Sequence, residues 1–454
     1  MEKATWLTFF LVAFFLRLIN LNQSLWLDEG ITSRVVTEYS FDKIISQFSP
    51  KDFHPPLYYL FLKLWTNFFG YSEISLRMPS VIFSLLTGYL IFQIGRRLKD
   101  YRTGLWAAGF FLFNPLIIYY SQEARMYSMV VFFLTAALFY FFKLVKNYGK
   151  KSFLNKEILL FNFFILLSFF TFYGSIFLIV SMILFFFYKK QTKNFFISSF
   201  ILLTAFLMVF SLFWQQRLNS QQSLAVVLNW KNVLGRANIK NLLLIPVKFA
   251  VGRLDFYPKW FYYLVAGLWT SYIWFFVFLS ALTQKRHDEK TLIYLLFFPL
   301  GLGTIVSFFT PLLQYFRFLY LAPILALILS LAIDIKIWRN FVLTGMIIFS
   351  LVYLIFPRFH REDWKSLAGQ LSEEKNIYMI YPSADALRYY KKDLKIIDLR
   401  EIKNLHDKEI IVIPYTAEIY GFDYQKILLE KKYFLKTKKI FRGVFYEIWA
   451  KTTP

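Results

Sequence analysis

The sequence predicts a mainly α-helical membrane protein with about eleven transmembrane helices, additional interfacial helices, and a small C-terminal α/β domain. The 454 residues are 57% hydrophobic and 22% aromatic, and their mean hydropathy is +0.47. These values exceed those of ordinary soluble proteins. Long apolar runs continue to about residue 356, after which charged residues become frequent. We therefore expect a membrane domain over 1–356 and a soluble domain over 357–454.

The apolar runs can be assigned as spans because crossing a bilayer takes about 20 apolar residues. The predicted spans are 4–20, 74–95, 104–119, 126–143, 156–171, 175–188, 195–213, 260–282, 291–309, 312–333 and 340–356. With these spans, every basic cluster falls on one side, which the positive-inside rule makes cytoplasmic. The clusters lie near Arg96, Lys146, Lys189, Lys285 and Lys336. This topology predicts a multi-pass protein of the plasma (inner) membrane, with a cytoplasmic N-terminus and an extracytoplasmic C-terminal domain.

Two segments need a specific interpretation to keep this parity. Residues 154–188 are too long for one span and have basic residues at both ends, so we expect a hairpin that turns at Tyr173-Gly174. Residues 55–69 would reverse every later loop if they crossed, so we expect an interfacial helix. This helix lies on the predicted outer side, where the first loop covers 21–73. In that loop Ile31, Val35, Val36 and Tyr39 recur at helical spacing.

The C-terminal segment has the pattern of a compact α/β domain. Its predicted elements are a helix over 363–371, a strand over 377–381, a helix over 384–390, and strands over 410–414 and 444–449.

The net charge of +24 does not indicate nucleic-acid binding here, because Lys and Arg flank apolar runs. The chain has no Cys, which excludes disulfides and thiolate metal sites. The apolar run that ends at Leu18 lacks a small-residue cleavage site, which favours an uncleaved first span.

The first outer loop contains two candidate functional blocks. Asp28 and Glu29 lie in Trp26-Leu27-Asp28-Glu29-Gly30. A carboxylate there could take a proton from the hydroxyl or amine of an acceptor substrate, or help to bind a divalent cation. The alternative is a solvated acidic turn or a helix cap. His54 precedes two prolines and the pair Tyr58-Tyr59, and it could donate to a phosphate. The alternative is an aromatic belt at the headgroup level.

Two further blocks lie in short outer turns. Glu123, Arg125 and Tyr127 lie between two apolar spans, where charges should pair with each other or with a ligand. The alternative is a Glu–Arg pair that ties two helices together. Arg317 presents a guanidinium suited to phosphate oxygens, or else it snorkels. Arg17, within the first span, is expected to snorkel or pair internally. Because all four blocks emerge on one face, they predict an active site at the outer interface.

At these residues the chain resembles the GT-C glycosyltransferases, specifically the bacterial and archaeal relatives of protein O-mannosyltransferases and of the lipid A aminoarabinose transferase. The motifs that carry the resemblance are Trp26-Leu27-Asp28-Glu29, His54-Pro55-Pro56-Leu57-Tyr58-Tyr59, Ser75-Leu76-Arg77-Met78-Pro79-Ser80, Gly95-Arg96-Arg97-Leu98 and Ser121-Gln122-Glu123-Ala124-Arg125-Met126-Tyr127. Arg361-Glu362-Asp363-Trp364 also resembles the opening of the soluble domain in many such proteins.

The resemblance implies a sugar donor on a polyprenyl phosphate, transfer with inversion, and a lipid, protein or polysaccharide acceptor. It makes Asp28 the candidate catalytic carboxylate, supported by Glu29. It implies that His54 and Arg125 contact the donor phosphate or sugar, together with Arg317 if the last hairpin folds over the site. Tyr58, Tyr59, Glu123 and Tyr127 belong to the same candidate donor site. The chain has no Asp-Xaa-Asp motif, so metal dependence stays open, with Asp28 and Glu123 as candidate metal ligands.

Two other functions compete with a transferase. A lipid or sugar-lipid transporter would need polar residues along a transmembrane path, whereas the middle spans are mostly Phe, Leu and Ile. An assembly subunit would recruit a partner through its outer domain, and Asp28 would then be dispensable.

Overall fold

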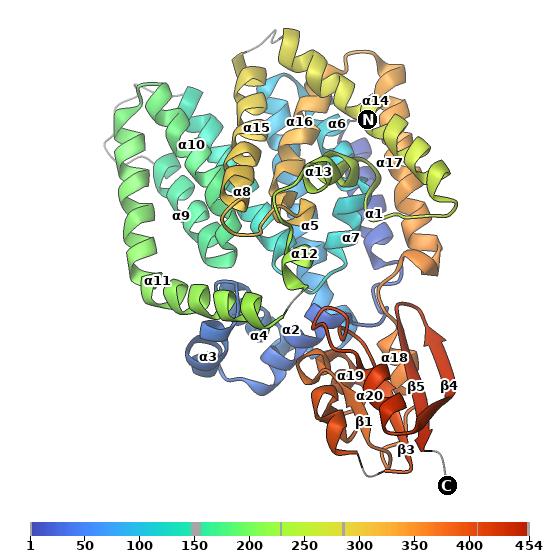
Figure 1. The fold of residues 1–454 in the computed structure, drawn as a ribbon. Coiled ribbons are helices and arrows are strands. Elements are labelled where there is room, and N and C mark those ends of the chain that lie inside the picture. Colours follow the sequence, from blue (N-terminus) through green and yellow to red (C-terminus); the bar gives the residue numbers. More distant parts are fainter. Residues whose placement is uncertain (1, 147–155, 228, 284–286, 406, 452–454) are drawn as a thin grey trace.

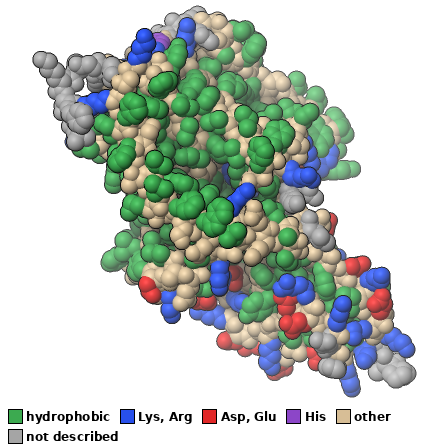
Figure 2. Space-filling view, turned by 60° about the vertical axis from the view of Figure 1, so that its left-hand side comes forward, with side chains coloured by type: hydrophobic (Ala, Val, Ile, Leu, Met, Phe, Trp, Pro, Cys, Tyr) green, Lys and Arg blue, Asp and Glu red, His purple; other side chains and the backbone are tan. Residues whose placement is uncertain are grey.

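The computed structural model describes residues 2–146, 156–227, 229–283, 287–405 and 407–451. It consists of a bundle of helices with a small sheet domain at one end (Figure 1). Apolar side chains cover the bundle, whereas acidic and basic side chains gather on the C-terminal domain (Figure 2). This distribution of side chains, with several long apolar helices, is that of a multi-pass membrane protein with a water-exposed domain.

The first part of the bundle is built from helices that are adjacent in sequence. These are α1 (Glu2–Leu18), α5 (Glu73–Leu98), α6 (Tyr101–Leu112), α7 (Pro115–Ser121) and α8 (Tyr127–Lys146). Helices α6 and α7 form one path bent by 63°. The break has a local cause, because Pro115 starts α7 and the Asn114 side chain caps it, accepting from Leu116 N at 2.9 Å.

The second part of the bundle begins with the hairpin predicted at Tyr173-Gly174, which the structure confirms. The 3₁₀ turn η3 (Tyr173–Ser175) separates α9 (Lys156–Thr171) from α10 (Ile176–Tyr188). The remaining helices are α11 (Thr192–Val226), α12 (Trp230–Leu234), α13 (Ile239–Val251), α14 (Lys259–Thr283), α15 (His287–Ser307), η4 (Tyr315–Leu321), α16 (Ala322–Ala332) and α17 (Lys336–Ile355).

Each of the eleven predicted spans overlaps a helix, but the count of eleven is not established. Among the described residues, seven helices are long and apolar enough to cross a membrane, or eight if the bent pair counts as one span. Helices α1, α9 and α10 have 17, 16 and 13 residues. A helix of 17 residues reaches only ~26 Å, slightly less than a ~30 Å hydrocarbon core.

Short helices lie at the same end of the bundle as the C-terminal domain (Figure 1). They are α2 (Leu27–Glu38), α3 (Phe41–Lys43), η1 (Ile44–Phe48), η2 (Ser49–Lys51) and α4 (Leu57–Phe69). Helix α2 contains three of the four residues whose spacing predicted it, and the fourth, Tyr39, is its C-cap. Helix α4 forms where an interfacial helix was predicted and ends at Gly70, whose φ of +77° suits glycine.

The C-terminal domain has the predicted α/β composition. It contains η5 (Pro357–Phe359), α18 (Trp364–Ala368), β1 (Ile377–Met379), η6 (Tyr381–Ser383), α19 (Asp385–Tyr390), β2 (Ile396–Asp398), η7 (Leu399–Asn404), β3 (Glu409–Ile413), α20 (Tyr424–Glu430), β4 (Tyr433–Phe441) and β5 (Val444–Lys451). The strand order is β2-β1-β3-β5-β4, with β1 parallel to both β2 and β3. Strand β5 runs antiparallel to β3 and β4. Buried clusters cover both faces of this sheet.

Charged residues of the first helices make ion pairs and buried hydrogen bonds within the bundle. The N-terminal end of α1 lies far from the sheet domain (Figure 1). Ion pairs join the C-cap of α5 and the last residue of α8 to later segments, with Lys99 Nζ 2.9 Å from Asp334 and Lys146 Nζ 3.0 Å from Asp288. Arg17 is fully buried and donates to Ser84 Oγ and to two carbonyl oxygens, which confirms the internal pairing expected for it.

Candidate active site

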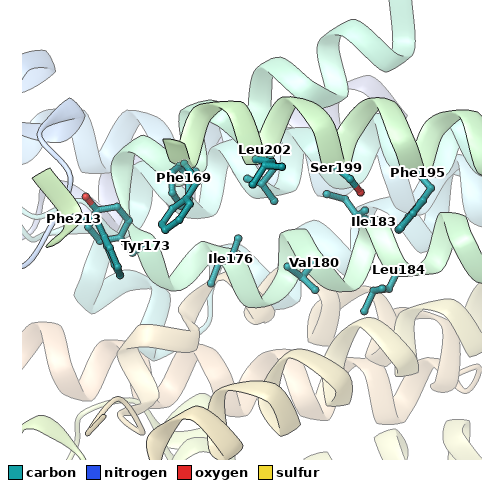
Figure 3. A pocket seen from close by; sticks show the side chains of 12 residues that line it. Phe169, Tyr173, Ile176, Val180, Ile183, Leu184, Phe195, Ser199, Leu202 and Phe213 are labelled. Carbon is teal, nitrogen blue, oxygen red and sulfur yellow. The ribbon is translucent and has the colours of Figure 1, made fainter. Parts of the chain in front are cut away.

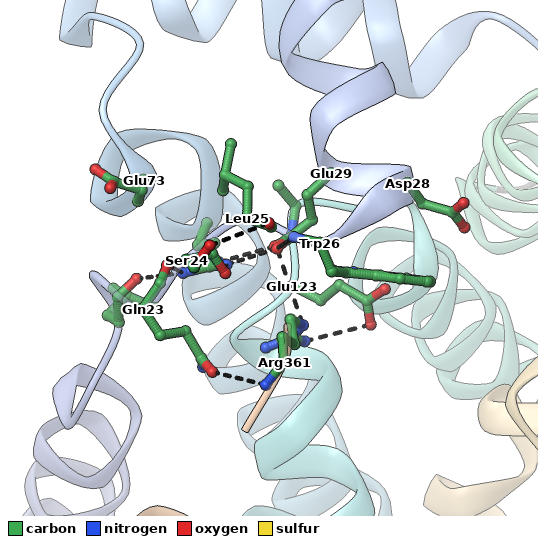
Figure 4. Close-up of polar contacts among 12 residues, drawn as sticks. Gln23, Ser24, Leu25, Trp26, Asp28, Glu29, Glu73, Glu123 and Arg361 are labelled. Carbon is green, nitrogen blue, oxygen red and sulfur yellow. Dashed lines mark hydrogen bonds and ion pairs between the residues drawn. The ribbon is translucent and has the colours of Figure 1, made fainter. Parts of the chain in front are cut away.

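The first turn of α2 carries two carboxylates in different surroundings (Figure 4). The Asp28 side chain is 34% exposed, and its Oδ2 lies 3.8 Å from Arg125 Nη2. The Glu29 side chain is fully buried and points toward the opposite side. The prediction treated these neighbours as one acidic motif, whereas the structure gives an accessible acid and a buried one. Only the accessible carboxylate can reach a substrate.

Glu29 is held by Arg77 of α5. Arg77 Nε lies 2.8 Å from Glu29 Oε1, and Arg77 Nη2 lies 2.5 Å from Oε2. The backbone N–H of Ala124 also donates to Oε1, at 2.8 Å. Burial alone would raise the pKa of Glu29, but the charges of Arg77 and Arg361 and these hydrogen bonds hold it below its usual value. Glu29 therefore stays ionised and joins α2, α5 and the turn after α7.

Arg77 also fixes the segment that leads into α2. Its guanidinium donates to the carbonyl oxygens of Leu21, Gln23 and Ser24 at 2.8, 2.6 and 3.0 Å. Every carbonyl in this set precedes Asp28 by only a few residues. The buried Arg77 guanidinium therefore fixes the backbone that leads into α2, and with it the orientation of Asp28.

Glu123 is buried in the turn between α7 and α8. In the part of the chain that the structure describes, neither of its carboxylate oxygens has a hydrogen-bond partner. Its nearest cation is Arg361, whose Nη2 lies 3.5 Å from Glu123 Oε2. Burial raises the pKa of Glu123 to about 7. The hypothesis of a Glu123–Arg125 pair is wrong, because the turn directs these side chains to different partners.

Arg125 faces Asp28 instead. Its Nη1 donates to the Tyr59 hydroxyl at 3.1 Å and to Thr32 Oγ1 at 3.4 Å. Tyr58 is buried against Tyr59, with ring centroids 5.7 Å apart. Arg125 Nε has no hydrogen-bond partner among the described residues. Arg125 is therefore a buried cation beside Asp28 whose hydrogen-bonding capacity is only partly used.

His54 approaches the same place from the loop before α4. Its ring stacks on Phe172 at a centroid distance of 6.1 Å, and its Nδ1 lies 3.5 Å from Asp52 Oδ2. The His54 carbonyl accepts a hydrogen bond from Gln216 Nε2 at 2.9 Å. Asp52 also interacts electrostatically with Arg125. With one ring nitrogen facing Asp52, the other can turn toward a ligand.

Tyr127 and Arg317 are less closely joined to this group. The Tyr127 ring packs on Phe316 with centroids 5.5 Å apart, so the last hairpin does reach the turn after α7. Arg317 Nη1, however, donates to the carbonyls of Leu234 and Pro311 at 3.2 and 2.9 Å. We find no direct contact of Arg317 with Asp28 or Arg125 among the described side chains.

A metal site does not form from the predicted ligands alone. Asp28 faces Arg125, whereas Glu123 faces Arg361. Over the described ranges, no group of three or more His, Cys, Asp or Glu side chains could hold a metal ion. The divalent cation stays a prediction.

An apolar groove lies between α9, α10 and α11 (Figure 3). Its volume is about 520 Å³. It is lined by residues of α9, η3, α10 and α11: Phe169, Tyr173, Ile176, Val180, Ile183, Leu184, Phe195, Ser199, Leu202, Leu203, Phe206 and Phe213. At one end Tyr173 donates to Gln216 Oε1 at 2.9 Å, and Gln216 in turn binds the His54 carbonyl. The groove is therefore connected to the His54 loop through two hydrogen bonds.

Four charged residues around the site were not predicted from the sequence. Asp52 lies two positions before His54, and this spacing was a usable signal. Arg77 and Arg361 stood within motifs that supported the resemblance, but no role was assigned to them. Arg253, which donates to the Tyr119 hydroxyl at 2.8 Å, gave no signal, because it is a single cation far from the other motifs in sequence.

The fold and site together define a class. A helical membrane bundle carries a partly exposed acid beside a buried arginine, close to a small α/β domain, and an apolar groove runs along α9, α10 and α11. This is the GT-C architecture that the motifs resembled.

Comparisons with known proteins agree with this class. The family model described as dolichyl-phosphate-mannose-protein mannosyltransferase matches residues 53–214. Comparison with curated protein sequences finds no match. ArnT from Cupriavidus metallidurans in the apo state has a similar structure, with a TM-score of 0.60 and 9% identity, over 99% of this chain and 98% of that one. AglB from Archaeoglobus fulgidus, an archaeal oligosaccharyltransferase, gives a TM-score of 0.57 at 11% identity, over 98% and 74% of the two chains.

The chain therefore has the GT-C fold, which confirms the predicted fold class. A second structure of the Cupriavidus ArnT, bound to undecaprenyl phosphate, matches with a TM-score of 0.57 at 10% identity, over 98% of this chain and 97% of that one.

Proposed function

We propose that this protein is a membrane glycosyltransferase that moves a sugar from a polyprenyl phosphate to an acceptor, with inversion at the anomeric carbon. The observation that carries the proposal is the pairing of a partly exposed carboxylate, Asp28, with the buried cation Arg125 at 3.8 Å. Transfer from a lipid phosphate needs both a proton acceptor and a cation for the leaving group, and these two groups lie side by side.

The reaction assigns a separate task to each group. A hydroxyl or amine of the acceptor attacks the anomeric carbon and loses its proton to Asp28. The bond between the anomeric carbon and the phosphate oxygen breaks, and its electron pair leaves with the polyprenyl phosphate. Arg125 and His54 offset the charge that builds on the phosphate. Tyr59 and Thr32 hold Arg125 in place.

Glu29 has a different role in this proposal. It is fully buried and saturated by Arg77 and Ala124, so it does not contact substrate. It is a positioning residue, which fixes the first turn of α2 and so the direction of Asp28. We assign Arg317 and Tyr127, which are less closely joined to Asp28, to contacts with the distal part of the donor.

The apolar groove supports a lipid donor. Its lining is almost entirely hydrocarbon, and it is connected to the His54 loop through Tyr173 and Gln216. A polyprenyl chain in this groove would place its phosphate beside His54 and Arg125. The structures of ArnT bound to undecaprenyl phosphate and of AglB in complex with a dolichol-phosphate agree with a donor of this chemical class.

The proposed orientation follows the charge pattern. The protein lies in the plasma (inner) membrane with its N-terminus in the cytoplasm and its C-terminal domain outside, so transfer takes place on the extracytoplasmic face. The acceptor is a lipid, a protein or a polysaccharide presented from that side. No nucleic acid takes part.

The test is Asp28→Asn in membranes supplied with radiolabelled polyprenyl-phosphate sugars. We expect transfer to fall by roughly 100-fold or more, because a general base contributes 10²–10⁴-fold. Expression and membrane insertion should be unchanged. Asp42→Asn, which alters an exposed carboxylate of the same outer loop, is the matched control and should keep its activity. Normal transfer by the Asp28 variant would end the proposed mechanism.

A further inference from the structure

The C-terminal domain touches the helix that carries Asp28. Helix α19 packs against α2 so closely that a Cβ added to Gly30 would lie 2.4 Å from Ala386 N and 2.6 Å from Ala386 Cα. No side chain fits there without moving α19, because the atoms in the way belong to the backbone. Gly30 follows Glu29 and lies two residues after Asp28. The domain is thus in contact with the active-site turn itself.

Polar contacts flank this close approach. Arg34 Nε of α2 lies 2.8 Å from Asp385 Oδ2 of α19, and the Asp385 side chain is only 6% exposed. The backbone N–H of Leu25, just before α2, donates to the Tyr390 hydroxyl at 2.8 Å. Both ends of α19 are therefore joined to the start or the middle of α2.

Arg361, at the entry to the domain, reaches further into the membrane domain (Figure 4). Its side chain is 1% exposed. Its Nη2 lies 3.5 Å from Glu123 Oε2, and its Nε lies 3.9 Å from Glu29 Oε2. The Tyr119 ring lies under the guanidinium at 4.4 Å, and the Tyr119 carbonyl accepts from Nη2 at 3.2 Å.

Arg361 is the counter-charge for two buried carboxylates that belong to different elements. Glu29 and Glu123 would repel each other in a buried site, and Arg361 lies between them as a counter-charge. One carboxylate belongs to α2 and the other to the turn after α7. Removing the cation leaves buried charge uncompensated, which costs several kcal/mol in comparable sites. The two elements that carry Asp28 and Arg125 then lose a shared anchor.

We infer that the docked C-terminal domain holds α2, and with it Asp28, in its working position, and that Arg361 is a positioning residue for this purpose. The inference rests on the proposed function for its catalytic consequence. It assigns the domain a part in building the active site, through the packing of α19 on α2 around Gly30 and through the Arg361 bridge.

A spin label on the exposed face of α2 measures this directly. The chain has no Cys, so Thr37→Cys gives a single labelling site, and Thr37 is exposed. We expect the label to be immobile in the parent protein and more mobile in Gly30→Ala and in Arg361→Gln. Gly301→Ala, where a Cβ would meet nothing within 4 Å, is the matched control and should not change the spectrum.

Kinetics gives the second readout. Displacing Asp28 in Gly30→Ala should lower kcat, by about 100-fold for a shift near 1 Å, while KM for the donor changes little because the turn that carries Arg125 stays in place. Arg361→Lys, which keeps the charge, should recover part of the lost kcat. An equally immobile label in Gly30→Ala and Arg361→Gln, or an unchanged kcat, would overturn the inference. Because the label needs no substrate, a parent protein without transferase activity would refute the proposed function and leave the label result standing.

Discussion

The buried Glu29–Arg77 pair gives a quantitative prediction. Arg77→Met removes a guanidinium that makes two contacts with Glu29 and three with the carbonyls of residues 21, 23 and 24. Glu29 is left buried with the Ala124 N–H and with Arg361 at 3.9 Å. Breaking a buried pair from one side costs about 3–5 kcal/mol, because the remaining charge is uncompensated. We expect a loss in the free energy of unfolding of that size.

The assay is reversible unfolding of the purified protein in mixed micelles. Arg96→Met changes an exposed arginine near the other end of the same helix, so it controls for the loss of a cation from α5. The double variant Glu29→Gln/Arg77→Met should be less destabilised than Arg77→Met, because no lone charge is left behind. A loss below about 1 kcal/mol for Arg77→Met, the range of exposed ion pairs, would refute the reasoning.

Two further predictions concern pH and the groove. The pKa of Glu123 is raised from its usual 4.5 to about 7 in the folded protein, so the stability that this group contributes is present at low pH and is lost as pH rises through about 7. Glu123→Gln should flatten this dependence in unfolding measured between about pH 5 and 8, and a parent-like slope in the variant would contradict the assignment. Val180→Trp narrows the groove and should raise KM for long-chain donors while leaving short-chain donors unaffected. Leu207→Trp, on an exposed position of α11, is its control. Equal effects of Val180→Trp on donors of both chain lengths would show that the groove does not bind the prenyl chain.

Hydropathy and charge predicted the architecture because both act over whole segments. The break at Tyr173-Gly174 followed from a length argument, since one helix could not place basic residues at both of its ends on the same side. The prediction of the C-terminal domain was less complete, because strands β2 and β4 were not predicted. Strand β2 has only three residues, and β4 contains Lys436, Lys438 and Lys439 on an exposed edge, so neither shows apolar alternation.

The site was predicted as a set of residues but not as a set of partners. The convergence of Asp28, Tyr59 and Arg125 followed from the topology, and the structure brings them together. Which cation meets which acid did not follow, because side chains adjacent in sequence point to opposite sides of a turn. Asp28 and Glu29 diverge for this reason, and Glu123 meets Arg361 from more than 200 residues away.

The central claim is that the phosphate of a polyprenyl donor binds beside Asp28. The most direct measurement is a structure of the full chain with polyprenyl phosphate bound. We expect the phosphate within hydrogen-bond distance of Arg125 and His54, with the prenyl chain in the groove between α10 and α11. A phosphate bound at the other end of the bundle, near Lys99 and Lys146, would contradict it.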